Sequence, residues 1–270
     1  METKVTTESA PFTSNLLKGK KGLVLGVANK RSIAWAIARA LRNHGAELAF
    51  TYQGDRLEEG VKDLVGTLGY QAPVYPCDVM DDGQVKNLFE SVGRDFGALH
   101  FLVHAIAYAK KEDLEGRTID TSKEGFHTAL DISAYSLIKL VKAAESLLEK
   151  EGGSVVALTY LGSVRAVPHY NVMGIAKAAL ESSVRYLALD LGKKNIRVNG
   201  VSAGPVSTLA ARGISGFTSM LENHRNRAPL GRNVEVEEVA NTAFFLLSPL
   251  GSGITGEVIY VDCGYRIMGI

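Results

Sequence analysis

The chain has few cysteines, no dominant charge and no long apolar run, and each absence excludes a class of protein. Cys77 and Cys263 are the only cysteines in 270 residues, so we expect neither a disulfide framework nor a bound metal. Thirty basic side chains balance 29 acidic ones, which leaves no field that would attract nucleic acid or a membrane surface. No stretch has the length of a membrane span or the core of a secretion signal. A reducing cytoplasm is the expected location.

Strand and helix patterns alternate along most of the sequence. Short apolar runs beside glycine predict seven strands, at residues 21–28, 46–52, 72–77, 101–107, 153–159, 196–202 and 257–262. Between them, apolar residues recur every three to four positions and predict helices, at residues 33–44, 56–68, 82–96, 123–150, 172–191 and 236–247. The alternation predicts an α/β fold: one Rossmann-type domain, residues 18–270, with a doubly wound, seven-stranded parallel sheet, preceded by a polar tail over residues 1–17.

In such a sheet, ligands bind beyond the carboxyl ends of the strands. The first strand runs through Gly26 and Ala28 into a helix that begins at Ile33, with Ser32 at the expected N-cap position. A strand, a glycine loop and a helix N-terminus can present backbone N–H groups to a phosphate. The spacing is not the usual G-x-G-x-x-G, and an ordinary turn explains it nearly as well.

The residues at the ends of the second and third strands each allow more than one interpretation. Gln53 is neutral where an acid favours NAD and an arginine can bind the extra phosphate of NADP, and Asp55 and Arg56 both follow. Asp78, followed by Val79, could accept from an adenine amino group or cap the helix that begins near residue 81.

The fourth strand ends in small residues, as if the backbone must approach a flat ligand: Ala105, Ile106 and Ala107. His104 lies within this apolar strand, and a hydrogen-bonded core histidine is the favoured interpretation over a catalytic base.

Two tyrosines and a lysine follow the fifth strand. Tyr160 comes directly after that strand, Tyr170 begins the next helix, and Lys177 lies seven residues further on. Seven residues make almost two turns, so Tyr170 and Lys177 share one helix face about 10.5 Å apart along the axis. A phenol and an ammonium aimed at one crevice suggest a pair that manages a proton and a charge. Packing and surface roles are the commoner explanation for these residue types.

Residues 211–228 mix glycine, serine and large apolar side chains without a steady period. Such an irregular insertion beside a site is typical of a substrate lid, which we place at about residues 207–228. We expect it to order only when a ligand supplies contacts, because ordering costs about 1–2 kcal/mol per residue. The alternative is a helix pair that is packed at all times.

Several segments together resemble the short-chain dehydrogenase/reductase superfamily, and within it the divergent bacterial enoyl-[acyl-carrier-protein] reductases. They are GVANKRSIAWAIA, CDV, HAIAYA, TYLG, PHYNVMGIAKAALE, RVNGVSAGPVSTLAARGI and ITGEVIYVDCG, and they cover nearly the whole chain from about Lys18. Tyr-x6-Lys with an upstream tyrosine is typical of this branch, whereas ordinary members use Tyr-x3-Lys with a serine. The literal Tyr-x3-Lys at Tyr135 and Lys139 lies before the fifth strand and is interpreted as structural. The chain departs from the pattern at Ala107, often glycine in relatives, and at Tyr108, usually phenylalanine.

The resemblance implies an oxidoreductase that uses NADH to reduce the trans-2 double bond of an enoyl thioester on acyl-carrier protein, the last step of fatty-acid elongation. It implies that Tyr170 stabilises the enolate, that Lys177 holds the nicotinamide ribose, and that Tyr160 is also catalytic, in a role left open. Relatives suggest a homotetramer. The alternatives are another reductase of this fold, such as a 3-oxoacyl reductase, or a catalytically silent nucleotide-binding scaffold.

The resemblance and the strand ends together give the expected binding residues. For the cofactor they are Gly26, Ala28, Ser32, Ile33, Gln53, Asp78, Val79, Ala105, Ile106, Ala107, Lys177, Val206, Ser207, Thr208, Leu209 and Ala210. For the substrate they are Ala109, Leu114, Tyr160, Tyr170, Met173 and Phe217. NADH is expected over NADPH, because Gln53 cannot neutralise a ribose phosphate and Asp55 would repel one.

Overall fold

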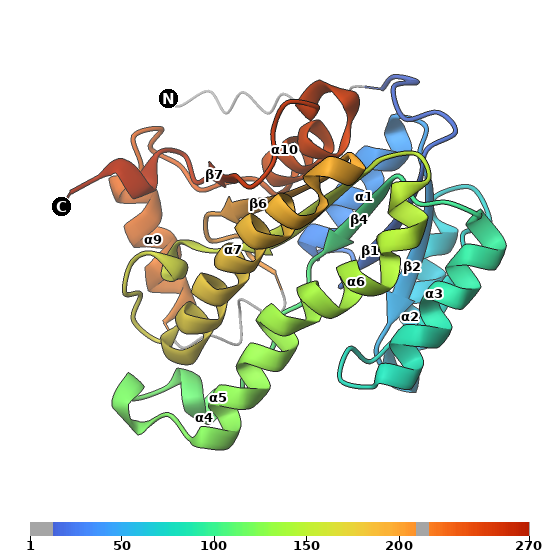
Figure 1. Ribbon diagram of the computed structural model, residues 1–270. Helices are drawn as coiled ribbons and strands as arrows, with labels where there is room; N and C mark the ends of the chain where they lie inside the picture. Colours follow the sequence, from blue (N-terminus) through green and yellow to red (C-terminus); the bar gives the residue numbers. More distant parts are fainter. Residues whose placement is uncertain (1–12, 209–215, 270) are drawn as a thin grey trace.

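Seven strands form one parallel sheet in the order β3-β2-β1-β4-β5-β6-β7 (Figure 1). The computed structural model describes residues 13–208 and 216–269. The strands are β1 (Lys21–Leu25), β2 (Glu47–Tyr52), β3 (Val74–Pro76), β4 (Phe101–His104), β5 (Gly153–Thr159), β6 (Ile196–Ala203) and β7 (Val258–Val261). The order reverses between the neighbours β1 and β4, which creates the crevice that doubly wound sheets use for ligands. The predicted fold class is confirmed.

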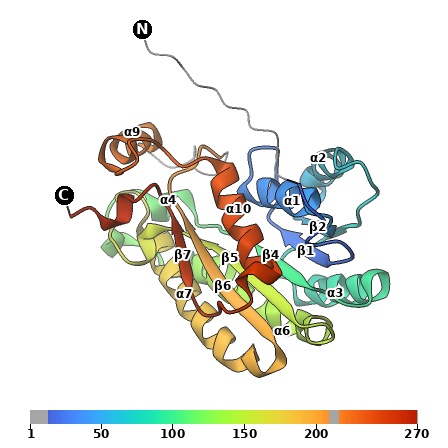
Figure 2. The same cartoon turned by 90° about the horizontal axis from the view of Figure 1, so that it is seen from above.

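Helices cover both faces of the sheet (Figure 2). One layer consists of α1 (Ile33–Asn43), α2 (Asp55–Gly66) and α10 (Val236–Leu247), and the opposite layer of α3 (Asp82–Phe96), α6 (Ser136–Glu149) and α7 (Asn171–Leu191). Shorter helices lie near the carboxyl edge of the strands: α4 (Lys111–Leu114), α5 (Lys123–Leu130) and α9 (Phe217–Arg227). None of the described helices combines the length and apolarity that crossing a membrane requires.

The central strands are mostly apolar because both of their faces are covered. In β4, Phe101 and Val103 pack in the core beneath α1 and α10, while Leu102 packs in the opposite core beneath α3 and α6. All three side chains are fully buried. The continuous apolar run at this position therefore reflects two cores that share one strand.

The structure corrects several predicted boundaries. The first and fourth strands end at Leu25 and His104, earlier than predicted, and the residues that follow are irregular chain at the edge of the sheet. The third strand is shorter at both ends. The helix predicted over residues 123–150 is interrupted by a π-helical turn, Asp131–Tyr135, between α5 and α6. This turn holds the loop after β4 through side-chain hydrogen bonds.

The region predicted to be an irregular lid contains the helix α9. Its Phe217 is buried, and Met220 contacts Tyr160, so tertiary contacts override the weak local pattern. Residues 209–215 lie outside the described residues, and the ligand dependence of the segment stays a prediction.

Candidate active site

A cavity of about 520 Å³ opens beyond the carboxyl ends of β5 and β6. We call it the reaction cavity. Its walls come from the start of α1, the loop after β4, the start of α7, the loop after β6 and helix α9. The lining residues are Ile33, Ala107, Tyr108, Ala109, Lys111, Leu114, Leu158, Thr159, Tyr160, Tyr170, Met173, Lys177, Ala203, Gly204, Pro205, Val206, Thr208, Phe217 and Met220. Most are apolar, and Tyr160, Tyr170 and Lys177 meet here as the sequence predicts.

Tyr160 and Tyr170 pack edge to face, with ring centroids 4.9 Å apart and an interplanar angle of 66°. The backbone at Gly162 lies close to the Tyr170 ring, and a Cβ on Gly162 would collide with that ring. The glycine therefore makes this pairing possible. The residues on either side of Tyr170 have positive φ, 61° at His169 and 33° at Asn171. Positive φ is strained for residues other than glycine. Tertiary contacts must therefore hold this turn.

Asn171 provides some of the contacts that stabilise this turn. Its Nδ2 donates to the carbonyl oxygens of Leu114 at 3.1 Å, Gly116 at 3.3 Å and Glu115 at 3.4 Å, while its Oδ1 accepts from the Thr118 hydroxyl at 3.2 Å. These bonds join the start of α7 to the segment that follows α4. Asn171 thus fixes two walls of the reaction cavity relative to each other, a role that sequence reasoning missed.

Burial keeps both tyrosines protonated. It raises the pKa of Tyr160 to about 12 and raises the pKa of Tyr170 still further above its usual value. The Tyr160 hydroxyl donates to the Met220 Sδ at 3.5 Å. At neutral pH each phenol can therefore act as a hydrogen-bond donor towards a negatively charged oxygen in the cavity.

Lys177 is a buried cation attached to the end of β5. Its Nζ donates to the Leu158 carbonyl oxygen at 2.7 Å, and only 5% of the residue is exposed. Burial lowers the pKa of Lys177 to about 8, and the Glu181 carboxylate opposes this effect. Glu181 is itself buried one turn along α7 and accepts from the Thr159 hydroxyl at 2.6 Å. This second polar contact between β5 and α7 was also missed.

The π-helical turn positions the loop after β4. The Ser133 Oγ accepts from the Tyr108 N–H at 2.9 Å and donates to the Tyr108 carbonyl oxygen at 3.0 Å. Single π-turns inside helices occur often at functional sites, and this one sets a wall of the reaction cavity. Nothing in the local sequence distinguishes Ser133 from other helical serines.

His104 is held by the residue that follows the same turn. The Ser136 hydroxyl donates to the Ile132 carbonyl oxygen at 2.6 Å, so it accepts from His104 Nε2 at 2.7 Å. His104 is fully buried, as predicted. Burial, together with the nearby positive charge of Lys177, lowers its pKa to about 3. His104 is therefore a hydrogen-bonded core residue through Nε2, whereas its Nδ1 has no partner among the described residues.

The loop after β1 leaves the N-terminus of α1 accessible. Ser32 occupies the predicted N-cap position, but its side chain does not cap the helix. Instead, its Oγ accepts from the N–H groups of Ala28 at 3.2 Å and Asn29 at 3.0 Å. Gly26 has a φ of 98°, and a Cβ there would collide with the Ala105 carbonyl oxygen. The backbone at Gly26 is therefore packed against the loop after β4, and Ser32 leaves the N-terminus of α1 without a side-chain cap, as an anion site requires.

A separate hollow, of about 550 Å³, lies at the ends of β2 and β3. Gln53 Nε2 donates there to Asp78 Oδ2 at 3.1 Å. Asp78 does not cap α3, since Asp81 does so by accepting from the Gln84 N–H at 3.0 Å. The lining includes Asp55 and Asp78, whereas Arg56 is not part of it. The hollow therefore favours a neutral, hydrogen-bonding ligand group over an anionic one.

The predicted site residues that the structure describes fall into four groups. The reaction cavity gathers Ile33, Ala107, Ala109, Leu114, Tyr160, Tyr170, Met173, Lys177, Val206, Thr208 and Phe217. Gln53 and Asp78 line the hollow at β2 and β3, and the loops at the strand ends carry Gly26, Ala28, Ser32, Ala105, Ile106 and Ser207. Val79 is a core residue, with 6% exposed. Leu209 and Ala210 lie outside the described residues. Among those described, no group of three or more His, Cys, Asp or Glu could hold a metal.

Comparison with known proteins agrees with this geometry. Residues 26–266 match the family model described as enoyl-(acyl carrier protein) reductase. The chain belongs to the enoyl-(acyl carrier protein) reductase family. It is 52% identical to the enoyl-[acyl-carrier-protein] reductase [NADH] FabI of Rickettsia felis over 258 residues, 96% of this chain and 98% of that protein. The Bacillus subtilis reductase of the same name is 52% identical over 252 residues, 93% of this chain and 97% of its own.

Solved structures of this family share the fold. The Bacillus cereus reductase in complex with NADP+ and indole naphthyridinone superposes with a TM-score of 0.93 and 51% identity, covering 95% of this chain and all of that one. The Anaplasma phagocytophilum reductase in complex with NAD gives a TM-score of 0.92 and 48% identity, covering 96% of this chain and 98% of that one.

Replacing Ser133 by alanine tests the role of the π-turn. The Tyr108 N–H and carbonyl would lose their partner, so we expect unfolding to require about 1–3 kcal/mol less free energy. Hydrogen exchange at the Tyr108 amide should also become faster. Ser183→Ala is the matched control, because the Ser183 hydroxyl donates to the Ala179 carbonyl within its own helix. Unchanged exchange at Tyr108 in Ser133→Ala would contradict the assigned role.

Proposed function

We propose that this chain reduces the trans-2 double bond of an enoyl thioester carried by acyl-carrier protein, with NADH as the reductant. The observation that carries the proposal is the arrangement of Tyr160, Tyr170 and Lys177 around one apolar cavity at the strand ends. Family membership and the names of relatives over nearly the full chain support the activity.

The reaction cavity suits an acyl chain. Ala109, Leu114, Met173 and Phe217 contribute apolar surface on the side of Tyr170. Sites for apolar ligands combine such surface with a few polar groups that fix orientation. The polar groups here include the two phenols and the Lys177 ammonium, so the thioester carbonyl is expected beside these three and the acyl chain beyond.

The chain also has the features that a dinucleotide requires. NADH, when bound, supplies the hydride that adds to the β-carbon of the substrate. The Gly26 loop and the N-terminus of α1 would hold the diphosphate, because that helix end is not capped by Ser32. Gln53 and Asp78 would hold the adenosine, and Lys177 would bind the nicotinamide ribose. Neutral Gln53 with the nearby carboxylates of Asp55 and Asp78 supports NADH over NADPH, although the Bacillus cereus relative was solved with NADP+.

Tyr170 acts on charge that develops during the reaction. As the β-carbon gains hydride, negative charge accumulates on the thioester oxygen. A protonated phenol in a partly buried site donates a stronger hydrogen bond to that oxygen than to the neutral carbonyl, which lowers the barrier. The edge-to-face contact with Tyr160 holds the Tyr170 ring in place. Lys177 adds positive potential at the same end of the cavity.

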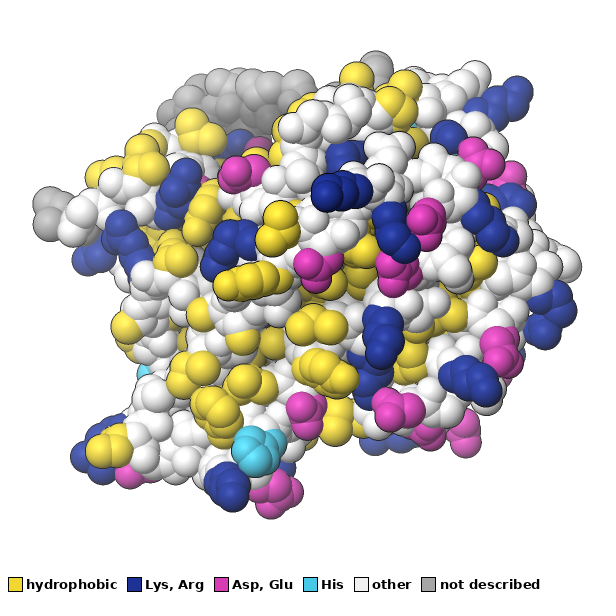
Figure 3. Space-filling view, viewed as in Figure 1, with side chains coloured by type: hydrophobic (Ala, Val, Ile, Leu, Met, Phe, Trp, Pro, Cys, Tyr) yellow, Lys and Arg dark blue, Asp and Glu magenta, His cyan; other side chains and the backbone are white. Residues whose placement is uncertain are grey.

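We further propose a homotetramer. Large apolar side chains are exposed on α7 at Ile175, Tyr186 and Leu189, and near the start of α6 at Tyr135 and Ile138. Figure 3 shows apolar side chains gathered over this face of the molecule. Contiguous apolar surface of this kind marks interfaces, and a second copy of the chain is the expected partner.

A pair of thioesters tests the reaction. The chain should oxidise NADH with crotonyl thioester but not with acetoacetyl thioester, followed by absorbance. NADH should also give a higher kcat/KM than NADPH. Oxidation with the β-keto substrate alone would assign the chain to the 3-oxoacyl reductases instead, and oxidation with neither would support a silent scaffold.

Tyr170→Phe removes the proposed donor and keeps the ring. Loss of one donor to a developing oxyanion typically costs about 10²–10³ in kcat, so we expect a loss of this size with little change in the dissociation constant of NADH. Tyr135→Phe is the control, since Tyr135 does not line the reaction cavity and phenylalanine keeps its apolar ring at the proposed interface. Equal kcat in Tyr170→Phe and the unmodified chain would remove Tyr170 from the mechanism.

The pH dependence follows from Lys177. Its pKa in the folded chain is lowered to about 8, so the ammonium is present below that pH and is lost above it. We expect kcat/KM for NADH, which reports the free enzyme, to fall as the pH rises through about 8. His104, Glu181 and both tyrosines are the other titratable groups near Lys177.

Lys177→Arg is the informative variant for this profile. Arginine keeps its charge throughout the range, so any remaining activity should lose the alkaline decline. A decline at the same pH in Lys177→Arg would assign the titration to another group.

A further inference from the structure

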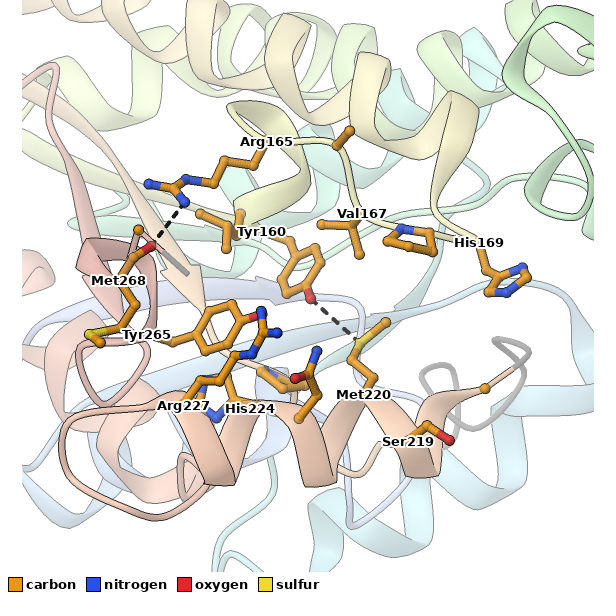
Figure 4. A pocket seen from close by; sticks show the side chains of 17 residues that line it. Tyr160, Arg165, Val167, His169, Ser219, Met220, His224, Arg227, Tyr265 and Met268 are labelled. Carbon is orange, nitrogen blue, oxygen red and sulfur yellow. Dashed lines mark hydrogen bonds between the residues drawn. The ribbon is translucent and has the colours of Figure 1, made fainter.

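A second chamber, of about 530 Å³, adjoins the reaction cavity (Figure 4). The two share Tyr160, Pro205 and Met220 in their linings. The Tyr160 hydroxyl and the Met220 sulfur, 3.5 Å apart, form part of the wall between them. A thioether is a weak acceptor, so separating these two side chains costs little. In the proposed function, the thioester of a bound substrate would lie beside Tyr160 and therefore next to this wall.

The second chamber differs from the reaction cavity in being lined by two arginines. Arg165 enters from the loop after β5 and Arg227 from α9, on opposite walls (Figure 4). None of the described residues that line the chamber is acidic. Neither guanidinium forms an ion pair within the described part of the chain. The Arg165 Nη1 donates to the Met268 carbonyl oxygen at 3.2 Å, which fixes this guanidinium at the rim.

Further polar side chains line the chamber, beside apolar residues such as Leu161, Val167 and Met268. Burial lowers the pKa of His224, so its ring is uncharged at neutral pH, and it stacks on Tyr265 with centroids 4.8 Å apart. Ser219 and Asn223, both on α9, add side chains that can form hydrogen bonds. The chamber therefore combines hydrogen-bonding side chains with two guanidinium groups that have no carboxylate partner among the described residues. Such a set suits a ligand with amide groups and a phosphate.

We propose that the second chamber binds the phosphopantetheine arm of the thioester substrate, with its phosphate against Arg227 and Arg165. The inference rests on the proposed function, in which the acyl chain occupies the reaction cavity. A thioester held beside Tyr170 must extend its other arm out of that cavity, and the chamber lies directly behind Tyr160. Tyr160 and Met220 then flank the junction between the acyl chain and the arm, and α9 contributes both Met220 and Arg227 to this path.

The proposal is tested with two substrates that differ only by the phosphate. Crotonyl thioesters of 4′-phosphopantetheine and of pantetheine are compared by kcat/KM with saturating NADH. A charge-assisted hydrogen bond contributes about 1.5–3 kcal/mol, so we expect the unmodified chain to prefer the phosphorylated substrate by about 10-fold to 150-fold. Arg227→Gln should lose most of this preference, and Arg165→Gln part of it.

Arg225→Gln is the matched control, because Arg225 lies on the same helix, is exposed and does not line the chamber. It should keep the full preference, and Arg227→Lys should keep part of it. Equal kcat/KM for both substrates in the unmodified chain, or an unchanged preference in Arg227→Gln, would overturn the proposal. Failure of the unmodified chain to reduce either thioester would instead refute the proposed function.

Discussion

The hydrogen bond from the Lys177 ammonium to the Leu158 carbonyl joins α7 to the end of β5, and the geometry of the site depends on it. A buried ammonium is costly unless its charge is compensated. The carbonyl at the strand end and the Glu181 carboxylate provide that compensation. The second bond, from Thr159 to Glu181, joins the same strand end to the same helix. Two polar contacts in a low-dielectric layer therefore fix the position of the helix relative to the sheet.

This fixed helix allows strain to be concentrated in the turn before it. His169 and Asn171 adopt positive φ on either side of Tyr170, and the bonds of Asn171 to the segment after α4 hold that conformation. Gly162 provides the space in which the Tyr170 ring meets Tyr160. The orientation of the Tyr170 phenol is thus determined by contacts on three sides of the turn.

Tyr160 lies between two environments. On the side of Tyr170 the lining is mainly apolar, and on the other side two arginines and several polar groups face a separate chamber. An enoyl thioester has the same division, with a hydrocarbon chain on one side of the carbonyl and a polar, phosphorylated arm on the other. The match between these two patterns supports the proposed substrate path along the sheet edge, α7 and α9.

The sequence by itself determined the alternation of strands and helices, the ligand-binding edge and the placement of Tyr170 and Lys177 on one helix face. These features follow from local periodicity, in which apolar residues repeat at the period of their own element. The helices over residues 82–96 and 236–247 and the fifth strand even have the predicted bounds.

Only the tertiary structure decided which distant groups meet. Ser133 binds a residue 25 positions away, and Asn171 reaches residues 55 to 57 positions away. Periodicity shows which face of an element is buried but not the partner it meets. The helix α9 was one of two alternatives that the sequence left open, because its apolar residues are stabilised by contacts with other elements. Such contacts depend on how the chain closes in space, and no local pattern encodes that.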